Sequence, residues 1–289
     1  MTNIKTLVKD IYSLFDPSVH IEPKKEHLDQ FGENMKRLVT EKLAEVSQTP
    51  ALRMSNLGTA CDRQLWLKIN EPGKGEPMPP YTYLKFIYGH LIEELLLLLA
   101  KVAGHEVTDE QKEVDIQGVK GHIDGKIDGV LTDVKSASTF SFEKFEKGLT
   151  KEEDGFGYLT QLGGYNYATS NGKKEPAAFL AMDKQNGYLT LDMHSDDLHK
   201  VDYEKLVSYK KEMLSGPMPP RGFSDEPDGY KKKIDGKYKL IPNGNRKLGT
   251  VCSYCDRKNR CWPGLRTFTY SGGPKFFSKV VKEPKVEEA

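Results

Sequence analysis

The stretch that decides the fold reads GHIDGKIDGVLTDVK and runs from Gly121 to Lys135. Its β-branched residues alternate with polar ones and are interrupted by glycines, which is typical of short strands joined by tight turns. Successive side chains of a strand point to opposite faces, so Asp133 and Lys135 are expected to share one face while Val134 packs into the core. An Asp-x-Lys triplet arises roughly once by chance in a chain of this length, so its surroundings must support it.

Asp124 lies one short strand before Asp133, and a hairpin would bring the two carboxylates together. Two carboxylates at one point repel each other unless one is protonated or a cation lies between them. A divalent ion that prefers oxygen ligands, Mg²⁺ or Mn²⁺, meets this need. The alternative is that Asp124 and Asp128 are ordinary turn residues beside glycines. We favour that alternative for Asp128 and the metal ligand for Asp124.

A third carboxylate is expected from a helix predicted over Tyr81 to Ala103, which contains the apolar run Leu91 to Ala100. A helix with almost no polar face is expected to be buried on nearly all sides. An ionised carboxylate there is costly unless it is paired or binds a metal. Glu93 is therefore the predicted ligand, with Glu94 as the alternative. His90, one turn earlier, is interpreted as a histidine of a capping turn rather than as a co-ligand.

Gln161 and Tyr165 are four residues apart, so they share one face of a helix predicted over Tyr158 to Ser170. The glycines between them, Gly163 and Gly164, would allow a bulky group to approach closely. An amide and a phenol on one face suit contact with a nucleotide. The alternative is a packed tyrosine beside an exposed glutamine.

The rest of the chain alternates between helical and strand patterns. Apolar residues at helical spacing predict helices over 4–15, 26–46, 55–69, 140–149 and 201–214. Short β-branched segments predict strands over 107–116, 119–123, 127–134, 177–182 and 188–193, the last two joined at Asn186-Gly187. This order predicts an α/β core with appendages at both ends.

Charge is divided unevenly along the 289 residues. The whole chain carries 43 basic and 42 acidic side chains, but residues 221–289 hold 16 Lys and Arg against 8 Asp and Glu. That segment therefore has a net charge of +8 and residues 1–220 one of −7. Tyrosines such as Tyr230 and Tyr238 lie among these cations, a composition that favours a surface for phosphates and bases. The alternative is a solvated, partly flexible region. Residues 272–289 are predicted to be a flexible tail.

Three of the four cysteines are close together, at Cys252, Cys255 and Cys261, and Cys61 lies far upstream. Such a set can serve a zinc site or an iron–sulfur cluster, with an inert buried thiol as the alternative for Cys61. Four cysteines are too few for a disulfide scaffold, and the longest apolar run is half the span of a bilayer. We therefore expect a protein of the reducing cytoplasm with no membrane partner.

Together these motifs, in this order, resemble the PD-(D/E)XK nuclease superfamily, in particular its RecB-type branch with the Gln-x-x-x-Tyr motif. The resemblance spans roughly residues 55–261 and implies a restriction-endonuclease-like core, a central mixed sheet flanked by helices. The family pattern falls on these residues of this chain: Asp124, Asp133, Lys135, Gln161 and Tyr165. The helix motif of the family usually ends in a histidine ligand, and Glu93 stands at that position here.

The resemblance also implies the organisation of the chain. Residues 1–54 would form an N-terminal helical extension, 55–220 the nuclease core, 221–271 a basic C-terminal lobe with the cysteine cluster, and 272–289 the tail. In iron–sulfur members of this branch, one cysteine before the core and three after it hold a [4Fe–4S] cluster. The cysteines here match that arrangement, with zinc as the lesser alternative. Neighbouring cations are predicted to bind nucleic acid: Arg257, Lys258 and Arg260.

The activity that the resemblance implies is a Mg²⁺- or Mn²⁺-dependent DNA exonuclease acting on single-stranded DNA or free ends and leaving a 5′-phosphate. Glu93, Asp124, Asp133 and the Val134 carbonyl would hold the ion, and Lys135 would orient the attacking water. Gln161 would position water or phosphate, and Tyr165 would pack on the strand.

The biological setting is also implied by the resemblance. Because no GxxxxGK[ST] loop occurs in the chain, a helicase or recombinase partner would be a separate protein. A bacteriophage recombination or replication enzyme is favoured over a CRISPR spacer-processing nuclease. Two alternatives remain: a non-catalytic DNA-binding module for a partner replication or recombination protein, and an endonuclease that cuts duplex DNA.

Overall fold

The computed structural model describes residues 3–44 and 50–289, and they form two compact units. The first unit consists of Met1–Gly58 and Pro79–Glu212, and the second of Thr59–Met78 and Met213–Ala289. The end of the helix predicted over 26–46 lies outside the described residues.

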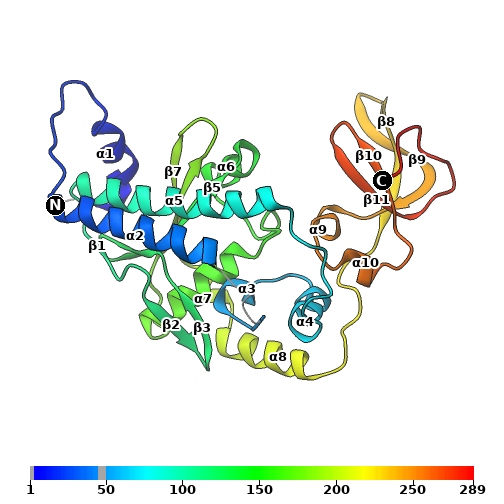
Figure 1. Cartoon of the computed structure of the whole chain (residues 1–289), viewed down its shortest axis with the longest axis horizontal. Helices are drawn as coiled ribbons and strands as arrows, with labels where there is room; N and C mark the ends of the chain where they lie inside the picture. The colour runs from blue at the N-terminus through cyan, green and yellow to red at the C-terminus, as the bar shows by residue number, and fades with distance from the viewer. Residues whose placement is uncertain (1–2, 45–49) are drawn as a thin grey trace. The chain divides into compact units, whose positions relative to one another are not determined.

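A five-stranded mixed sheet forms the centre of the first unit (Figure 1). Its order is β1 (Val107–Thr108), β4 (Gly125–Ile127), β5 (Val130–Ala137), β6 (Ala177–Asp183) and β7 (Leu189–His194). Only β5 and β6 pair in parallel; the other neighbours are antiparallel. The crossover from β5 to β6 contains α6 (Thr139–Glu146) and α7 (Tyr158–Ser170). The predicted α/β class with a mixed central sheet is confirmed.

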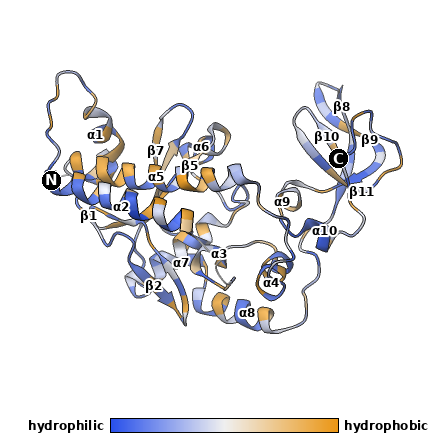
Figure 2. Cartoon of the chain, viewed as in Figure 1, coloured by the Kyte–Doolittle hydropathy of each residue, from blue (hydrophilic) through white to orange (hydrophobic). Residues whose placement is uncertain are grey.

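One face of this sheet packs against η1 (Ile4–Thr6), α1 (Leu7–Ser13) and α5 (Pro80–Val102), with α2 (Lys25–Ala44) lying along α5 (Figure 1). Leu96 and Leu97 of α5 share a buried cluster with Val134 of β5, so Val134 does pack into the core. Figure 2 shows hydrophobic residues along much of α5.

The prediction that this long helix is buried on nearly all sides is wrong. Tyr81, Tyr83, Leu84 and Phe86 in the N-terminal half of α5 are exposed, because the sheet and α2 cover only the later turns. No helix among the residues that the structure describes is both long and apolar enough to cross a membrane.

The other face of the sheet is covered by α6, α7, α8 (Tyr203–Ser215) and a short 3₁₀ turn, η2 (Leu198–Lys200). A separate hairpin, β2 (Glu113–Ile116) with β3 (Val119–His122), and α3 (Met54–Leu57) complete this layer. Phe179 of β6 lies at its centre, fully buried, with the Phe145 ring centroid 5.3 Å away.

Turn chemistry divides the strands more finely than the sequence pattern predicts. The segment 127–134 is not one strand, because Asp128 and Gly129 both have positive φ, 49° and 80°, and form the tight turn between β4 and β5. The segment 107–116 is likewise interrupted at Asp109 and Gln111, with φ near 55°. The interpretation of Asp128 as a turn residue is confirmed.

The second unit combines a helix from early in the chain with a C-terminal sheet. The helix is α4 (Asp62–Asn70), and the antiparallel sheet has the order β10 (Arg266–Tyr270), β11 (Gly273–Lys279), β9 (Lys237–Lys247) and β8 (Glu226–Ile234). Two short helices, α9 (Thr250–Ser253) and α10 (Lys258–Cys261), lie between β9 and β10 in the chain. The buried rings of Phe268 and Phe277 meet edge to face at 5.5 Å.

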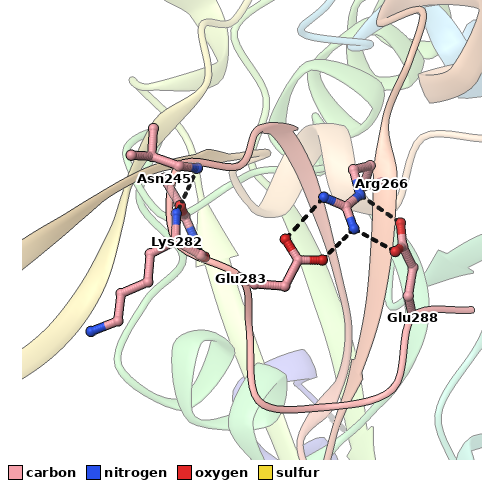
Figure 3. A network of polar contacts seen from close by, with 6 residues as sticks. Asn245, Arg266, Lys282, Glu283 and Glu288 are labelled. Atoms are coloured by element: carbon pink, nitrogen blue, oxygen red, sulfur yellow. Dashed lines mark hydrogen bonds and ion pairs between the residues drawn. The ribbon is translucent and has the colours of Figure 1, made fainter.

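The C-terminal residues contain regular structure instead of the predicted flexible tail. Strand β11 falls within them, and the last residues return along β10, where the Thr269 N–H donates to the Glu287 carbonyl. The Arg266 guanidinium forms paired contacts with Glu283 and Glu288 (Figure 3). The side chain of Asn245, itself buried, donates to the Lys282 carbonyl. Composition alone missed this because the segment is ordered by distant partners.

The predicted boundary between an extension and a core at residues 54 and 55 also differs from the structure. The single helix expected over 55–69 is two helices, α3 in the first unit and α4 in the second, separated at Gly58–Cys61. Residues 59–78 therefore belong with the C-terminal unit, although they precede most of the core in the chain.

The end of α3 meets the start of α7 through two glycines. A Cβ atom on Gly157 would lie 2.1 Å from the Gly58 carbonyl oxygen, and one on Gly58 would lie 2.3 Å from the Gly157 oxygen. Gly157 also has a φ of +79° and precedes Tyr158, the first residue of α7. Only glycine at both positions allows this backbone approach.

We expect Gly157→Ala to lower the free energy of unfolding by about 1 kcal/mol for its positive φ and by roughly 1–3 kcal/mol more for the clash. Gly187→Ala is the matched control, because Gly187 has a φ of +75° but open space around its Cβ position. Urea denaturation of both variants measures the difference. Equal losses for the two substitutions would show that the contact with Gly58 is unimportant.

Candidate active site and cysteine site

The strand β5 carries an ion pair in the interior of the first unit. The Lys135 Nζ lies 2.5 Å from the Asp133 Oδ2, and Asp133 is only 3% exposed. The ammonium also lies 4.8 Å from the centre of the Tyr158 ring and 6.0 Å from that of Phe179. Burial would lower the pKa of Lys135, but the carboxylates of Asp133 and Asp124 outweigh it and raise that pKa. Lys135 is therefore a firmly held cation.

Asp124 lies immediately before β4, opposite Asp133 on β5. The pairing of Gly125 with Thr132 places the two aspartates side by side at the next position of the ladder. The Asp124 Oδ2 accepts a hydrogen bond from the Val134 N–H at 2.7 Å. Burial, and then the negative charges of Glu93 and Asp133, raise the pKa of Asp124 well above its usual value. The expected hairpin thus brings these two carboxylates together.

Glu93 approaches the same carboxylates from α5. Burial raises the pKa of Asp133 as well, and the charge of Glu93 adds to it. The Glu93 carboxylate accepts a hydrogen bond from the Gln111 Nε2 at 2.6 Å and lies 3.4 Å from the His90 Nδ1. His90 is within the helix rather than in a capping turn.

Glu94, the alternative ligand, has a different environment. Its carboxylate accepts a hydrogen bond from Asn34 of α2 at 2.9 Å. Burial raises the pKa of Glu94. Of the two neighbouring glutamates, Glu93 is the one whose charge acts on Asp124 and Asp133.

The chemistry of these donors fits a hard divalent ion, although their present positions do not form a coordination group. Within residues 3–44 and 50–289, no group of three or more His, Cys, Asp or Glu side chains is arranged to hold a metal ion. The carboxylates of Asp133, Asp124 and Glu93 instead contact protein donors, as described above. The charges of Glu93 and Asp133 raise the pKa of Asp124, and a cation beside such carboxylates would offset this repulsion. Oxygen ligands are those that Mg²⁺ and Mn²⁺ prefer.

The Gln161–Tyr165 pair lies on one face of α7, but its surroundings differ from the prediction. The Gln161 Nε2 lies 3.4 Å from the Tyr165 hydroxyl. The Tyr165 ring is 3% exposed and packs beside Gly121, so it is not available to pack on a DNA strand. Burial raises the pKa of Tyr165 to about 12. The alternative, a packed tyrosine, describes the ring correctly.

Side chains of this protein, and not a ligand, pack against the two glycines of α7. A Cβ atom on Gly163 would lie 1.8 Å from the Tyr203 hydroxyl, and one on Gly164 would lie 3.1 Å from the Met54 Cε. The sequence spacing correctly indicates a close approach to this face. The approaching groups are α8 and α3, because the hydrophobic core of the unit closes here.

Three residues of the site were not predicted. Tyr158 places its ring beside Lys135, and Gln111 donates to Glu93. Asp154 accepts hydrogen bonds from the N–H groups of Gly157, Tyr158 and Leu159 and so orients the start of α7. An Asp a few residues before a helical pattern was the available signal for Asp154. Tyr158 and Gln111 have no local signal, because distant segments bring them to the site.

A second candidate site lies within the second unit. All four cysteines line one cavity, together with apolar side chains that include Leu67, Val251 and Trp262. Cys61 lies immediately before α4, and Gly222 packs against it: a Cβ atom on Gly222 would lie 3.1 Å from the Cys61 Sγ. The structure thus brings the upstream cysteine to the three downstream ones.

The cysteine cavity fits a metal centre in its donor chemistry. Burial, and then the neighbouring thiols of Cys61 and Cys261, raise the pKa of Cys252. Burial likewise raises the pKa of Cys255 to about 11. Thiols with such pKa values are protonated at neutral pH unless a metal replaces the proton. Among the described residues, the thiols are not arranged as a group that could hold a metal ion.

The cations beside the cysteines are held by acids of the same unit. The Arg257 guanidinium donates to the Glu71 carbonyl at 2.8 Å, and Arg260 binds the Glu71 carboxylate through two contacts of 2.9 and 3.0 Å. The Lys258 ammonium contacts Glu76, and both Arg257 and Lys258 are buried. These side chains join α10 to the segment after α4. Their binding to nucleic acid stays a prediction.

Comparisons with known proteins add little. No family model and no curated protein matches the chain. One solved structure, described as "Crystal structure of SSO0001", is similar over 80% of this chain and 95% of its own, with 14% identity and a TM-score of 0.41. A TM-score this low establishes no shared fold, so neither fold nor function is taken from it.

We expect Lys135→Met to lower the free energy of unfolding by about 3–5 kcal/mol, because it leaves the buried Asp133 without its cation. Adding Asp133→Asn should recover part of this loss. Lys147→Met is the control, because it breaks a Lys–Glu pair on the surface, which is worth less than about 1 kcal/mol. Urea denaturation at pH 7 measures all three. A loss for Lys135→Met no larger than the control would contradict the interior ion pair.

Proposed function

We propose that this protein is a metal-dependent DNA exonuclease of the RecB-type PD-(D/E)XK kind. One observation carries the proposal: Asp124 and Asp133 are side by side, the charge of Glu93 acts on both of them, and the Lys135 ammonium lies against Asp133. These residues come from α5, from the position before β4 and from β5, in the order that the sequence motif expects. Three neighbouring acids repel one another, which lowers the stability of the fold. A module that only binds DNA would gain nothing from such a cluster.

Hydrolysis of a phosphodiester adds the oxygen of water to phosphorus, breaks the bond to the 3′-oxygen, and leaves a 5′-phosphate and a 3′-hydroxyl. Lys135, kept protonated by Asp133 and Asp124, would orient the attacking water and offset the negative charge that develops on phosphorus. Gln161, whose side chain lies beside the Tyr165 hydroxyl, would position water or phosphate. Tyr165 would act through that hydroxyl and orient Gln161 rather than stack on the strand.

A divalent ion held by Glu93, Asp124, Asp133 and the Val134 carbonyl would supply Lewis-acid polarisation of the scissile phosphate. Two of these carboxylates already accept hydrogen bonds from the protein: Asp124 from the Val134 N–H and Glu93 from the Gln111 side chain. Those contacts orient the two carboxylates that would hold the ion.

In the second unit, we propose that Cys61, Cys252, Cys255 and Cys261 hold a [4Fe–4S] cluster, with zinc as the lesser alternative. The support is that all four thiols line one cavity. Four thiolate bonds would join α4 to the segment around α9 and α10, so the centre would stabilise the unit. The partners remain proposals: DNA with single-stranded regions or free ends, and a separate helicase or recombinase.

The nuclease test uses end-labelled single-stranded DNA, linear duplex and closed circular duplex with Mg²⁺ or Mn²⁺. We expect cleavage of the first two, and a loss of about 10²–10³ in rate for Lys135→Gln and for Asp124→Asn. DNA affinity, measured by fluorescence anisotropy in EDTA, should change little. Lys147→Gln, on the surface of the same unit, is the matched control and should cleave normally.

Two outcomes would contradict this proposal. Undiminished cleavage by folded Lys135→Gln would remove the catalytic lysine. Cleavage of closed circular DNA would show an endonuclease, because an exonuclease requires an end. Folding of each variant is checked by its urea transition, so that loss of activity is not confused with loss of structure.

The cluster test is elemental analysis of protein purified without oxygen. We expect iron and acid-labile sulfide with broad visible absorption, and their loss in Cys252→Ala together with a lower Tm of the second unit. Tyr254→Phe is the control, because Tyr254 lies between two of the cysteines but is 82% exposed. Zinc without iron would favour the alternative metal, and no metal at all would contradict the proposal.

A further inference from the structure

The hairpin of β8 and β9 extends beyond the rest of its sheet. β11 pairs with β9 only near Arg246 and Lys247, whereas β8 and β9 stay paired out to Ile234 and Lys237. The turn at Asp235-Gly236 has φ values of 51° and 78°, the signs that a two-residue type I′ hairpin requires. Residues 230–241 therefore form a two-stranded ribbon, here called the β8–β9 ribbon, and no third strand from residues 3–44 or 50–289 pairs with it.

The β8–β9 ribbon is strongly basic and unneutralised. It contains one acid, Asp235, and five exposed lysines: Lys231, Lys232, Lys233, Lys237 and Lys239. None of these lysines forms an ion pair with any residue in the part of the chain that the structure describes. The contrast with Arg257, Lys258 and Arg260 is sharp, because each of those cations has an acidic partner.

The register sets like charges against each other. Lys232 is directly opposite Lys239, and cross-strand partners share a face of the ribbon. Lys237 lies two residues from Lys239 and shares that face. Like charges directly opposite each other destabilise a strand pair. The repulsion between these lysines therefore destabilises the ribbon, and a bound polyanion would neutralise it.

The opposite face of the ribbon is basic as well. Lys231 pairs with Leu240 and Lys233 with Tyr238 on that face, while Tyr230 lies on the face of Lys232. The two tyrosines, one on each face, are 60% and 73% exposed. Cations and exposed phenol rings on both faces fit a ligand that surrounds the ribbon on two sides.

We propose that the β8–β9 ribbon inserts into the major groove of duplex DNA and places one basic face toward each phosphate backbone. The major groove admits a two-stranded β-ribbon, and its two walls are lined with phosphates. Lysine contacts to phosphate give affinity without sequence specificity, as an exonuclease needs. The inference rests on the proposed function for the identity of the polyanion, and it assigns the duplex part of an end-containing substrate to the second unit.

The test compares two variants that remove five lysines each. The ribbon variant carries Lys→Gln at 231, 232, 233, 237 and 239, and the control carries Lys→Gln at five exposed positions of the first unit: Lys5, Lys9, Lys173, Lys174 and Lys200. Affinity for a duplex with a single-stranded overhang is measured by anisotropy in EDTA over a salt series. We expect the ribbon variant to lose more than about tenfold in affinity and about 4–5 in the slope of log K against log salt. The control should keep its slope.

A smaller variant separates binding from folding. Lys232→Gln with Lys239→Gln removes the opposed charges, so we expect a higher Tm together with a slope lower by about 1.8. A structural role for these lysines would instead lower the Tm and leave the slope unchanged, and that result would overturn the proposal.

Further arms identify the ligand. The ribbon variant should lose less affinity for single-stranded DNA than for duplex DNA. An equal loss for both would overturn the groove assignment. If the ribbon variant and the wild type bound duplex DNA with equal affinity, the inference would be overturned and the nuclease proposal would stand. Binding of anionic phosphatidylserine vesicles in preference to duplex would also overturn it. Loss of duplex binding in the ribbon variant, with no cleavage of any DNA by the wild type, would support the inference and reject the nuclease.

Discussion

The interior ion pair between Lys135 and Asp133 is the interaction on which the first unit depends. Two further acids, Asp124 and Glu93, act on the same groups, and burial raises the pKa of both aspartates. Such a group of charges is tolerated only because each member has a partner: an ammonium, a backbone N–H or an amide. The sheet makes this possible, since the β4–β5 turn sets the register that places Asp124 beside Asp133.

The environment of these charges is built by segments that close around β5. Tyr158 lies over Lys135, and its position depends on the contact between Gly58 and Gly157 and on the cap that Asp154 provides. The backbone geometry at the start of α7 and the electrostatics of the site are therefore linked. A change in the packing of α3 would therefore shift Gly157 and Tyr158, and with them the ring that lies beside the Lys135 ammonium.

The second unit uses basic residues in two ways. Around the cysteine cavity, cations such as Arg260 bind the acids of the α4 segment and hold two distant parts of the chain together. On the β8–β9 ribbon, the lysines have no such partners among the described residues, and Lys232 is directly opposite Lys239. Composition treats all of these residues alike. Their contacts differ because the acids Glu71 and Glu76 pair with cations of α10, whereas the ribbon extends past the last residues of β9 that pair with β11.

The sequence by itself determined features that depend on neighbouring residues. The shared face of Asp133 and Lys135, the interpretation of Asp128 as a turn residue, the limits of α7 and the mixed α/β order all follow from local periodicity and turn chemistry. The preference for Glu93 over Glu94 came from the cost of burying a carboxylate, together with the family pattern. These inferences hold because strand and helix geometry fixes which side chains share a face.

Only the tertiary structure decided which distant side chains pack against these helix and strand faces. Tyr203 and Met54, not a ligand, approach Gly163 and Gly164, and the Tyr165 ring is buried by the same packing. The C-terminal residues are ordered by Arg266 and Asn245, which lie far from them in the chain. The physical reason is common to these cases: a side chain's partner is set by long-range packing, and no local pattern records which distant segment will supply it.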